Sequence, residues 1–240
     1  MIASLARTAL DLLYPRQCQV CGDSLHCRAF PFLCDVCFGA VVRLPGPCCE
    51  VCGLPFHGDM FHKASCPNCT EMDLHFDRAR ALLRFHGVAR QAIHGLKYLR
   101  QLHWSRVLQA WQADGVGAVV DRAEVDVVMP VPLHPVRERE RGFNQAWVLV
   151  EPLAHMWRIA SHRRALVRVR QTETQTHLNR AERMSNLRGA FEVRRPEVIA
   201  GRRVLLVDDV LTTGSTTSEC ARVLREAGAT SVLVFTLARG

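Results

Sequence analysis

Apolar and polar positions over residues 76–240 follow two alternating patterns. Strand-like segments, several of them rich in β-branched residues, occur at RARALLRF (78–85), EVDVVMPVPL (124–133), ALVRVR (165–170), RRVLLVDD (202–209) and SVLVFTLA (231–238). Between them, apolar residues recur at helical spacing at 88–112 (two helices), 144–159 and 215–228. Strands that alternate with helices predict an α/β fold with a doubly wound parallel sheet. In the last helix, Cys220 lies on the apolar stripe and is therefore predicted to be a core residue.

The first 75 residues have a different composition. MIASLARTALDLLYPRQ has apolar residues at helical spacing but lacks the long apolar core and cleavage site of a signal peptide, so it predicts a short amphipathic helix. No later segment is apolar enough to span a membrane. Ten of the eleven cysteines lie between Cys18 and Cys69. We therefore expect two domains, residues 1–75 and 76–240, in a cytoplasmic protein.

Eight of these cysteines form four C-x2-C pairs. Two cysteines three positions apart on a tight turn point both sulfurs at one tetrahedral ion, and a second pair completes a closed four-thiolate site. In a reducing cytosol, metal thiolates are favoured over disulfides. The sequence therefore predicts two structural zinc sites, with the ligands Cys18, Cys21, Cys34 and Cys37 in one and Cys49, Cys52, Cys66 and Cys69 in the other.

The spacing leaves some ligand assignments open. The sequential pairing is the simplest, but an interleaved, cross-braced pairing fits the same spacing. Cys27 and Cys48 are left over and are interpreted as packing residues, although Cys48 can compete with Cys49. Because eight cysteines already supply two sites, three nearby histidines are interpreted as surface residues: His57, His62 and His75.

The positive charge of the chain lies entirely in its second part. Residues 1–75 carry five Lys/Arg and seven Asp/Glu, whereas residues 76–240 carry 26 and 16, a net charge of +10. Such an excess favours an anionic substrate, a phosphorylated ligand or nucleic acid as partner, and it is equally compatible with a basic surface that binds nothing specific.

The stretch VLLVDDVLTTGSTTSE (204–219) indicates what such a ligand is. Val204–Val207 reads as a buried strand, and Asp208 and Asp209 stand at its carboxyl end, where parallel sheets bind ligands. The following loop, Thr212–Thr216, offers hydroxyls, a glycine and a helix N-terminus, which together favour a phosphate. Carboxylates repel a phosphate but suit sugar hydroxyls or a divalent cation. A sugar 5-phosphate would suit both the acid pair, through its hydroxyls, and the loop, through its phosphate.

This stretch resembles the 5-phosphoribosyl-1-pyrophosphate (PRPP) motif of type I phosphoribosyltransferases. The whole chain is similar to the ComF family of competence-associated proteins, which join a cysteine-rich double zinc ribbon to a phosphoribosyltransferase domain. The resemblance also rests on the tandem C-x2-C pairs, PVPLHPVRERERGFNQA (130–146) and QTETQTHLNRAERMSNLRGAF (171–191). It implies a type I phosphoribosyltransferase-like sheet preceded by the zinc module.

The resemblance also implies ligand contacts. Asp208 and Asp209 would contact the ribose hydroxyls with Mg²⁺ nearby. The 5-phosphate would be held by Thr212, Thr213, Gly214, Ser215 and Thr216, and the pyrophosphate by the loop arginines Arg137, Arg139 and Arg141. Alternation with glutamates leaves a solvated loop as the other interpretation of these arginines. Three residues fall in the variable hood and flexible loop, where packing over the site is an equal alternative: Gln175, Arg183 and Asn186.

Two functions follow from the resemblance. One is a PRPP-binding protein in competence that handles imported single-stranded DNA together with proteins of the uptake machinery. The other is an active PRPP-dependent transferase whose acceptor is unknown; Thr212 stands where 6-oxopurine salvage enzymes have an acid, so the purine pattern is not met and no catalytic residue is assigned. A DNA-binding surface would draw on Arg158, Arg163, Arg164, Arg168, Arg170, Arg194, Arg195, Arg202 and Arg203, which otherwise form solvated charge runs.

Overall fold

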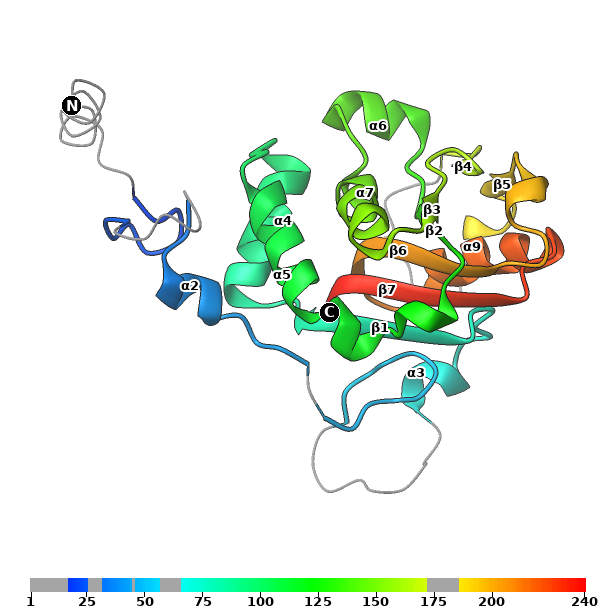
Figure 1. Ribbon diagram of the computed structural model, residues 1–240, viewed down its shortest axis with the longest axis horizontal. Coiled ribbons are helices and arrows are strands. Elements are labelled where there is room, and N and C mark those ends of the chain that lie inside the picture. The colour runs from blue at the N-terminus through cyan, green and yellow to red at the C-terminus, as the bar shows by residue number, and fades with distance from the viewer. Residues whose placement is uncertain (1–16, 26–31, 45, 57–65, 172–185) are drawn as a thin grey trace.

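The computed structural model describes residues 17–25, 32–44, 46–56, 66–171 and 186–240 (Figure 1). The N-terminal helix predicted for the first residues lies outside them, as do Cys27, His57, His62, Gln175 and Arg183. Within the described ranges, no helix has both the length and the apolar character needed to cross a bilayer.

A five-stranded parallel sheet forms the centre of the second part of the chain, with the strand order β1-β7-β6-β2-β3. Its strands are β1 (Arg78–Arg84), β2 (Val127–Pro130), β3 (Ala160–Ser161), β6 (Arg203–Leu211) and β7 (Ser231–Arg239). The central strands β6 and β7 are apolar on both faces because helices cover both sides, as their continuous apolar sequences predicted. The predicted α/β class is therefore confirmed, whereas the two-residue edge strand β3 was not predicted.

Helices pack on both faces of the sheet (Figure 1). One face packs against α4 (Gly87–Tyr98), α5 (Trp104–Val119) and α7 (Gln145–Trp157), around side chains such as Leu205 and Val207. The other face packs against α9 (Ser215–Glu226), where Cys220 is fully buried as predicted. The segment expected to hold two helices, 88–112, does so, and the second helix continues to Val119.

Two segments differ from the sequence-based expectation. The strand predicted at 165–170 exists as β4 (Leu166–Arg168), but it pairs antiparallel with β5 (Phe191–Val193) in a separate two-stranded sheet. The polar stretch at 134–144, expected to be a loop, contains α6 (Pro135–Arg141). His134 caps this helix, Pro135 begins it and Gly142 ends it at φ +88°. These capping residues favour a helix even though the segment is highly charged.

Where the structure describes it, the cysteine-rich part consists of turns and two short helices, α2 (Asp35–Gly39) and α3 (Pro67–Thr70). Two 3-10 turns, η1 (Arg122–Glu124) and η3 (Pro196–Val198), lie in the second part. Between the two cysteine groups, the chain runs along the edge strand β1: Leu44 N donates to Leu82 O and Arg84 N donates to Val42 O, at 3.0 and 2.8 Å. This pairing covers an edge that would otherwise expose unpaired backbone groups.

Candidate functional site

The structure brings the eight paired cysteines into two groups of four, Cys18/Cys21/Cys34/Cys37 and Cys49/Cys52/Cys66/Cys69. Within each group the sulfurs lie within 4.8 Å of one another, with Sγ–Sγ distances of 3.6 Å for Cys49–Cys69 and for Cys52–Cys66. Four thiolates at about 2.3 Å from a tetrahedral zinc ion lie about 3.8 Å apart. The donor set and spacing fit one zinc ion in each group, in the sequential pairing and not the cross-braced one.

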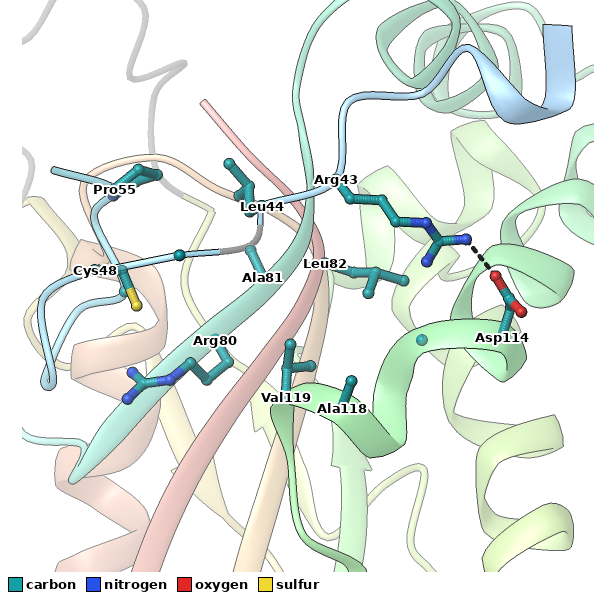
Figure 2. A pocket seen from close by; sticks show the side chains of 13 residues that line it. Arg43, Leu44, Cys48, Pro55, Arg80, Ala81, Leu82, Asp114, Ala118 and Val119 are labelled. Atoms are coloured by element: carbon teal, nitrogen blue, oxygen red, sulfur yellow. Dashed lines mark hydrogen bonds and ion pairs between the residues drawn. The ribbon is translucent and has the colours of Figure 1, made fainter. Parts of the chain in front are cut away.

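Among the described residues, the cysteine and the histidine left over near these groups, Cys48 and His75, take no part in them. Cys48 is outside the group that contains Cys49, so the predicted competition is not realised. His75 likewise lies outside both groups. Cys48 instead lines a cavity of about 410 Å³ between β1, α5 and the segment that links the two groups. Figure 2 shows Arg43 of that segment reaching across to an ion pair with Asp114 of α5.

The acid pair lies within β6, because the strand extends four residues beyond the end predicted at Val207. β7 pairs with β6 as far as Leu211, whereas β2 stops pairing at Val207. Asp208 and Asp209 therefore stand where one flank of β6 is no longer covered by a strand. This is the carboxyl edge of the parallel sheet, the place where such folds bind ligands.

The two acids point to opposite faces of the sheet, as consecutive strand residues do. Asp209 is buried, and its Oδ2 lies 2.6 Å from Nζ of Lys97 near the end of α4. Burial alone would lower the pKa of the Lys97 ammonium, but the carboxylates of Asp209 and Asp208 outweigh it, so the pKa is raised. Lys97 thus stays charged and forms a buried ion pair with the second acid of the motif.

Asp208 faces the side of the sheet covered by α9 and is only partly buried. Its Oδ1 accepts a hydrogen bond from Asp209 N at 2.9 Å. Burial, reinforced by the carboxylate of Asp209 and opposed by Lys97, raises the pKa of Asp208 to about 8. On the same side, burial lowers the pKa of the Arg168 guanidinium, and the nearby Asp208 counteracts part of that shift. The charge of Arg168 therefore acts on Asp208.

The loop predicted at Thr212–Thr216 consists of three residues that connect β6 to α9, Thr212–Gly214, and of the first two residues of the helix. Gly214 is the N-cap of α9 and has φ +93°, a conformation that favours glycine. Thr213 Oγ1 and Ser215 Oγ are 2.8 Å apart, and Ser215 N donates to Thr213 Oγ1 at 3.4 Å. Hydroxyls and the amides of a helix N-terminus are thus assembled beside the acids, an arrangement that suits a phosphate group.

The three arginines predicted to bind pyrophosphate lie on α6, where Arg137 and Arg141 share one face of the helix and Arg139 lies on the opposite face. Arg141 donates to Gln145 Oε1 and lies over the ring of Tyr98, with 5.7 Å from Cζ to the ring centroid. Arg137 is a charged neighbour of Arg168 and has its Nε 4.0 Å from Glu140 Oε2. Arg139 is exposed. The binding of pyrophosphate by these three arginines stays a prediction. The charge of Arg137 acts on Arg168, which is also influenced by Asp208.

Four arginines from the predicted DNA surface line one cavity of about 440 Å³: Arg163, Arg164, Arg168 and Arg194. The walls also include residues 132–135, directly after β2, and Asn144. Arg163 pairs with Glu138 at 2.7 Å and lies over the Trp147 ring, and Arg168 lies over Phe191.

Other members of the predicted DNA surface lie elsewhere. Arg203 pairs with Asp126 at 2.7 Å at the start of β6, the end of the strand remote from the acids. Arg195 pairs with Glu197 at 2.9 Å. Arg170 donates to the carbonyl oxygen of Asn186, a predicted hood residue, at 2.6 Å. The nine arginines therefore do not gather at one site, and four of them line the cavity that follows β2.

Sequence comparisons place both parts of the chain in known families. Residues 9–70 match the double zinc ribbon domain, and residues 150–240 match the phosphoribosyl transferase domain. The protein is therefore of the class that joins a double zinc ribbon to a phosphoribosyltransferase domain. It belongs to the ComF/YhgH family, as the following relatives show and as the sequence motifs indicated.

The relatives match along almost their whole length. The DNA utilization protein YhgH of Escherichia coli K12 is 33% identical over 238 residues, which cover 95% of this chain and 99% of the relative. Competence protein F of Haemophilus influenzae is 30% identical over 227 residues, 93% of this chain and 96% of the relative. Competence protein ComFC of Bacillus subtilis is 29% identical over 217 residues, 86% and 84% of the two chains.

Solved phosphoribosyltransferase structures match smaller parts. A glutamine PRPP amidotransferase from B. subtilis is 26% identical with a TM-score of 0.32, over 46% of this chain and 22% of that chain. An adenine phosphoribosyltransferase from Thermoanaerobacter pseudethanolicus is 15% identical with a TM-score of 0.36, over 59% and 83% of the two chains.

Sequence reasoning missed three residues that contact the candidate site. Lys97 carried a signal, because it continues the apolar stripe of α4 through Ile93, where a lysine is unexpected. Arg239 ends a continuously apolar strand and is buried, and Asn68 lies between two cysteine ligands and is also buried. For Arg239 and Asn68, the pattern of apolar and polar residues gave no indication of the residue that each one contacts.

Proposed function

We propose that this protein binds PRPP or a related ribose 5-phosphate and acts in DNA uptake, where it handles imported single-stranded DNA. The observation that carries the proposal is the placement of two elements at the carboxyl edge of the sheet. The acid pair and hydroxyl loop lie there at the end of β6, and the walls of the arginine-lined cavity include residues 132–135, which follow the neighbouring strand β2. A sugar phosphate suits the first element and a phosphate backbone suits the second.

At the ligand site, Asp208 and Asp209 contact the ribose hydroxyls, with Mg²⁺ bound nearby. The residues from Thr212 to Thr216 hold the 5-phosphate through hydroxyls and the amides of α9. Arg137, Arg139 and Arg141 hold the pyrophosphate. Two observations support this assignment: Asp208 is the more exposed of the two acids, and the ion pair with Lys97 fixes the position of Asp209.

The DNA role is supported by charge and by family. The net charge of +10 on residues 76–240 favours a polyanion, and the cavity gathers arginines that two aromatic rings hold in place. Relatives of nearly full-length similarity are named a DNA utilization protein and competence proteins. Proteins of the uptake machinery are then the expected partners.

A second candidate function is an active PRPP-dependent transferase without a DNA role. This function is favoured by the acid pair and the hydroxyl loop, which are both present in a geometry that suits a sugar phosphate. Pyrophosphate departure and developing positive charge at the ribose carbon would be stabilised by arginines and fixed dipoles. Loss of PRPP in the presence of a nitrogenous base, measured as pyrophosphate release, would separate this function from simple binding.

Titration of the zinc-loaded protein with PRPP and Mg²⁺ tests the ligand site. We expect saturable binding in the wild type and none in the Asp208→Asn/Asp209→Asn double variant, checked for its fold by circular dichroism. A folded double variant with unchanged affinity would refute the assignment of the acids.

A fluorescent oligothymidylate tests the DNA site. Binding should weaken steeply between about 50 and 200 mM salt, since displaced counterions drive phosphate contacts. Arg164→Gln with Arg194→Gln, two exposed arginines of the cavity, should reduce affinity and the salt slope. Arg90→Gln with Arg106→Gln removes the same charge from α4 and α5 and should have little effect. Equal losses in the two double variants would mean that net charge and not the cavity is responsible.

A further inference from the structure

The second cysteine group, Cys49/Cys52/Cys66/Cys69, packs directly against the loop Thr212–Thr216. Asn68 lies between Cys66 and Cys69 on α3 and is 3% exposed. Its Nδ2 donates a hydrogen bond to the carbonyl oxygen of Thr213 at 3.2 Å. A residue held between two metal ligands therefore contacts the backbone of the loop at its centre.

The segment that follows the group makes a second connection. Ser218 of α9 accepts a hydrogen bond from His75 N at 3.0 Å and donates to Asp73 O at 3.2 Å. Leu74 packs against the buried cysteines, and its side chain also approaches Gly214. Residues 68–75 thus contact both the loop and the first turn of α9 through hydrogen bonds and side-chain packing.

Arg239 makes a third connection, through charge. This last residue of β7 is 4% exposed, and its Nη2 lies 3.8 Å from Cys52 Sγ. It pairs in register with Leu211, the residue before Thr212. A buried guanidinium is costly unless a negative group lies close. A zinc ion bound by four thiolates leaves two negative charges in excess, so the loaded site would provide that compensation.

The first cysteine group has different neighbours. Gln91 of α4 donates its amide Nε2 to Gln19 O at 3.0 Å, and Trp111 of α5 donates its indole Nε1 to Phe38 O at 3.2 Å. Cys18 and Cys37 belong to the core formed with α4 and α5. The described contacts of the first group therefore lead to helices on the far side of the sheet from α9.

We propose that Asn68 is a positioning residue for the phosphate-binding loop, and that metal binding at the second cysteine group, not the first, holds this loop in its binding conformation. The inference rests on the proposed ligand of the loop. A metal ion fixes Cys66 and Cys69, which fixes the backbone of Asn68 and aims its amide at Thr213. The zinc ribbon is then part of the sugar-phosphate site as well as a folding element.

The test uses Asn68→Asp, which keeps the side-chain shape but replaces the amide donor by a carboxylate that faces a carbonyl oxygen. Amide hydrogen exchange of the ligand-free protein should become several-fold faster in residues 211–218, and the dissociation constant for PRPP/Mg²⁺ should rise about tenfold. Zinc content should stay unchanged. Asn68→Ala, which introduces no repulsion, should change both quantities in the same direction by a smaller factor.

Gln91→Ala is the matched control, because it removes an amide-to-carbonyl hydrogen bond from the other cysteine group. It should alter neither loop exchange nor PRPP affinity. Unchanged exchange and affinity in both Asn68 variants, with zinc content preserved, would overturn the proposal. Failure of the wild type to bind PRPP would overturn the proposed ligand instead, and loop exchange in the ligand-free Asn68→Asp protein would still decide whether the second group holds the loop.

Discussion

Lys97 Nζ lies 2.6 Å from Asp209 Oδ2, so the second acid of the PRPP-like motif forms an ion pair with a lysine from a helix more than one hundred residues earlier in the chain. Its neighbour Asp208 has no such cation as its main partner, and burial raises its pKa to about 8. Of two adjacent aspartates, Asp209 is therefore stabilised in its ionised form by a cation, whereas burial favours the protonated form of Asp208.

This asymmetry predicts opposite effects of two isosteric substitutions. Native Asp208 holds its proton up to about pH 8, whereas the unfolded chain releases it near the ordinary pKa of 3.8. Stability is therefore lost as pH rises from about 4 to 8. Asp208→Asn removes this loss and should raise the Tm at pH 8, by roughly 2–4 °C for each kcal/mol recovered in a chain of this size, with little gain at pH 4.

Asp209→Asn should do the reverse, because it leaves the buried Lys97 ammonium without its carboxylate. Breaking a buried pair by removing one partner costs about 3 kcal/mol. Thermal unfolding of both variants, from pH 4 to 9 and without ligand, measures the difference. Similar Tm changes in the two variants would contradict the assigned asymmetry.

Ligand binding should depend on pH through Asp208. If Asp208 must be ionised to contact ribose hydroxyls or Mg²⁺, affinity for PRPP/Mg²⁺ should rise about tenfold between pH 7 and 9, as the carboxyl group loses its proton around pH 8. Calorimetry in two buffers of different ionisation enthalpy should detect proton release below pH 8. In Asp208→Asn, any residual affinity should be flat over this range. A flat profile in the wild type would argue against the ionised acid as a ligand contact.

Arg239 should affect metal retention at one cysteine group only. Arg239→Met keeps much of the apolar volume but removes the cation beside Cys52, and loss of a group that supports a metal ligand typically costs 10- to 100-fold in metal affinity. Competition with a chromogenic chelator should show one of the two metal ions released more readily. Arg43→Met, which removes an exposed ion pair with Asp114, is the charge-matched control and should release zinc as the wild type does.

Metal analysis of the gently purified protein should find close to two zinc ions per chain.

Complete removal of zinc should unfold the cysteine-rich part, because its turns and very short helices bury too little apolar surface to fold alone. Circular dichroism and hydrogen exchange before and after chelation check this. A single zinc ion per chain would contradict the assignment of two four-cysteine sites.

Local chemistry made several features readable from the sequence. The C-x2-C spacing identified the eight cysteines of the two groups, whereas the structure decided for the sequential pairing over the cross-braced one. Continuous apolar runs specified β6 and β7, and the acids followed by a hydroxyl loop marked the carboxyl edge of the sheet. The α6 segment was misjudged because a high density of charge concealed a His-Pro start and a glycine stop.

The sequence by itself determined the α/β class and the cysteine-rich module with its four C-x2-C pairs, because each depends on periodicity or on spacing within a few residues. Only the tertiary structure decided which acid is paired, where the arginines gather and what supports the phosphate loop. Lys97 with Asp209, Asn68 with Thr213 and Arg239 with Cys52 join positions far apart in the chain. Such pairs arise from strand order and packing, which no local pattern encodes.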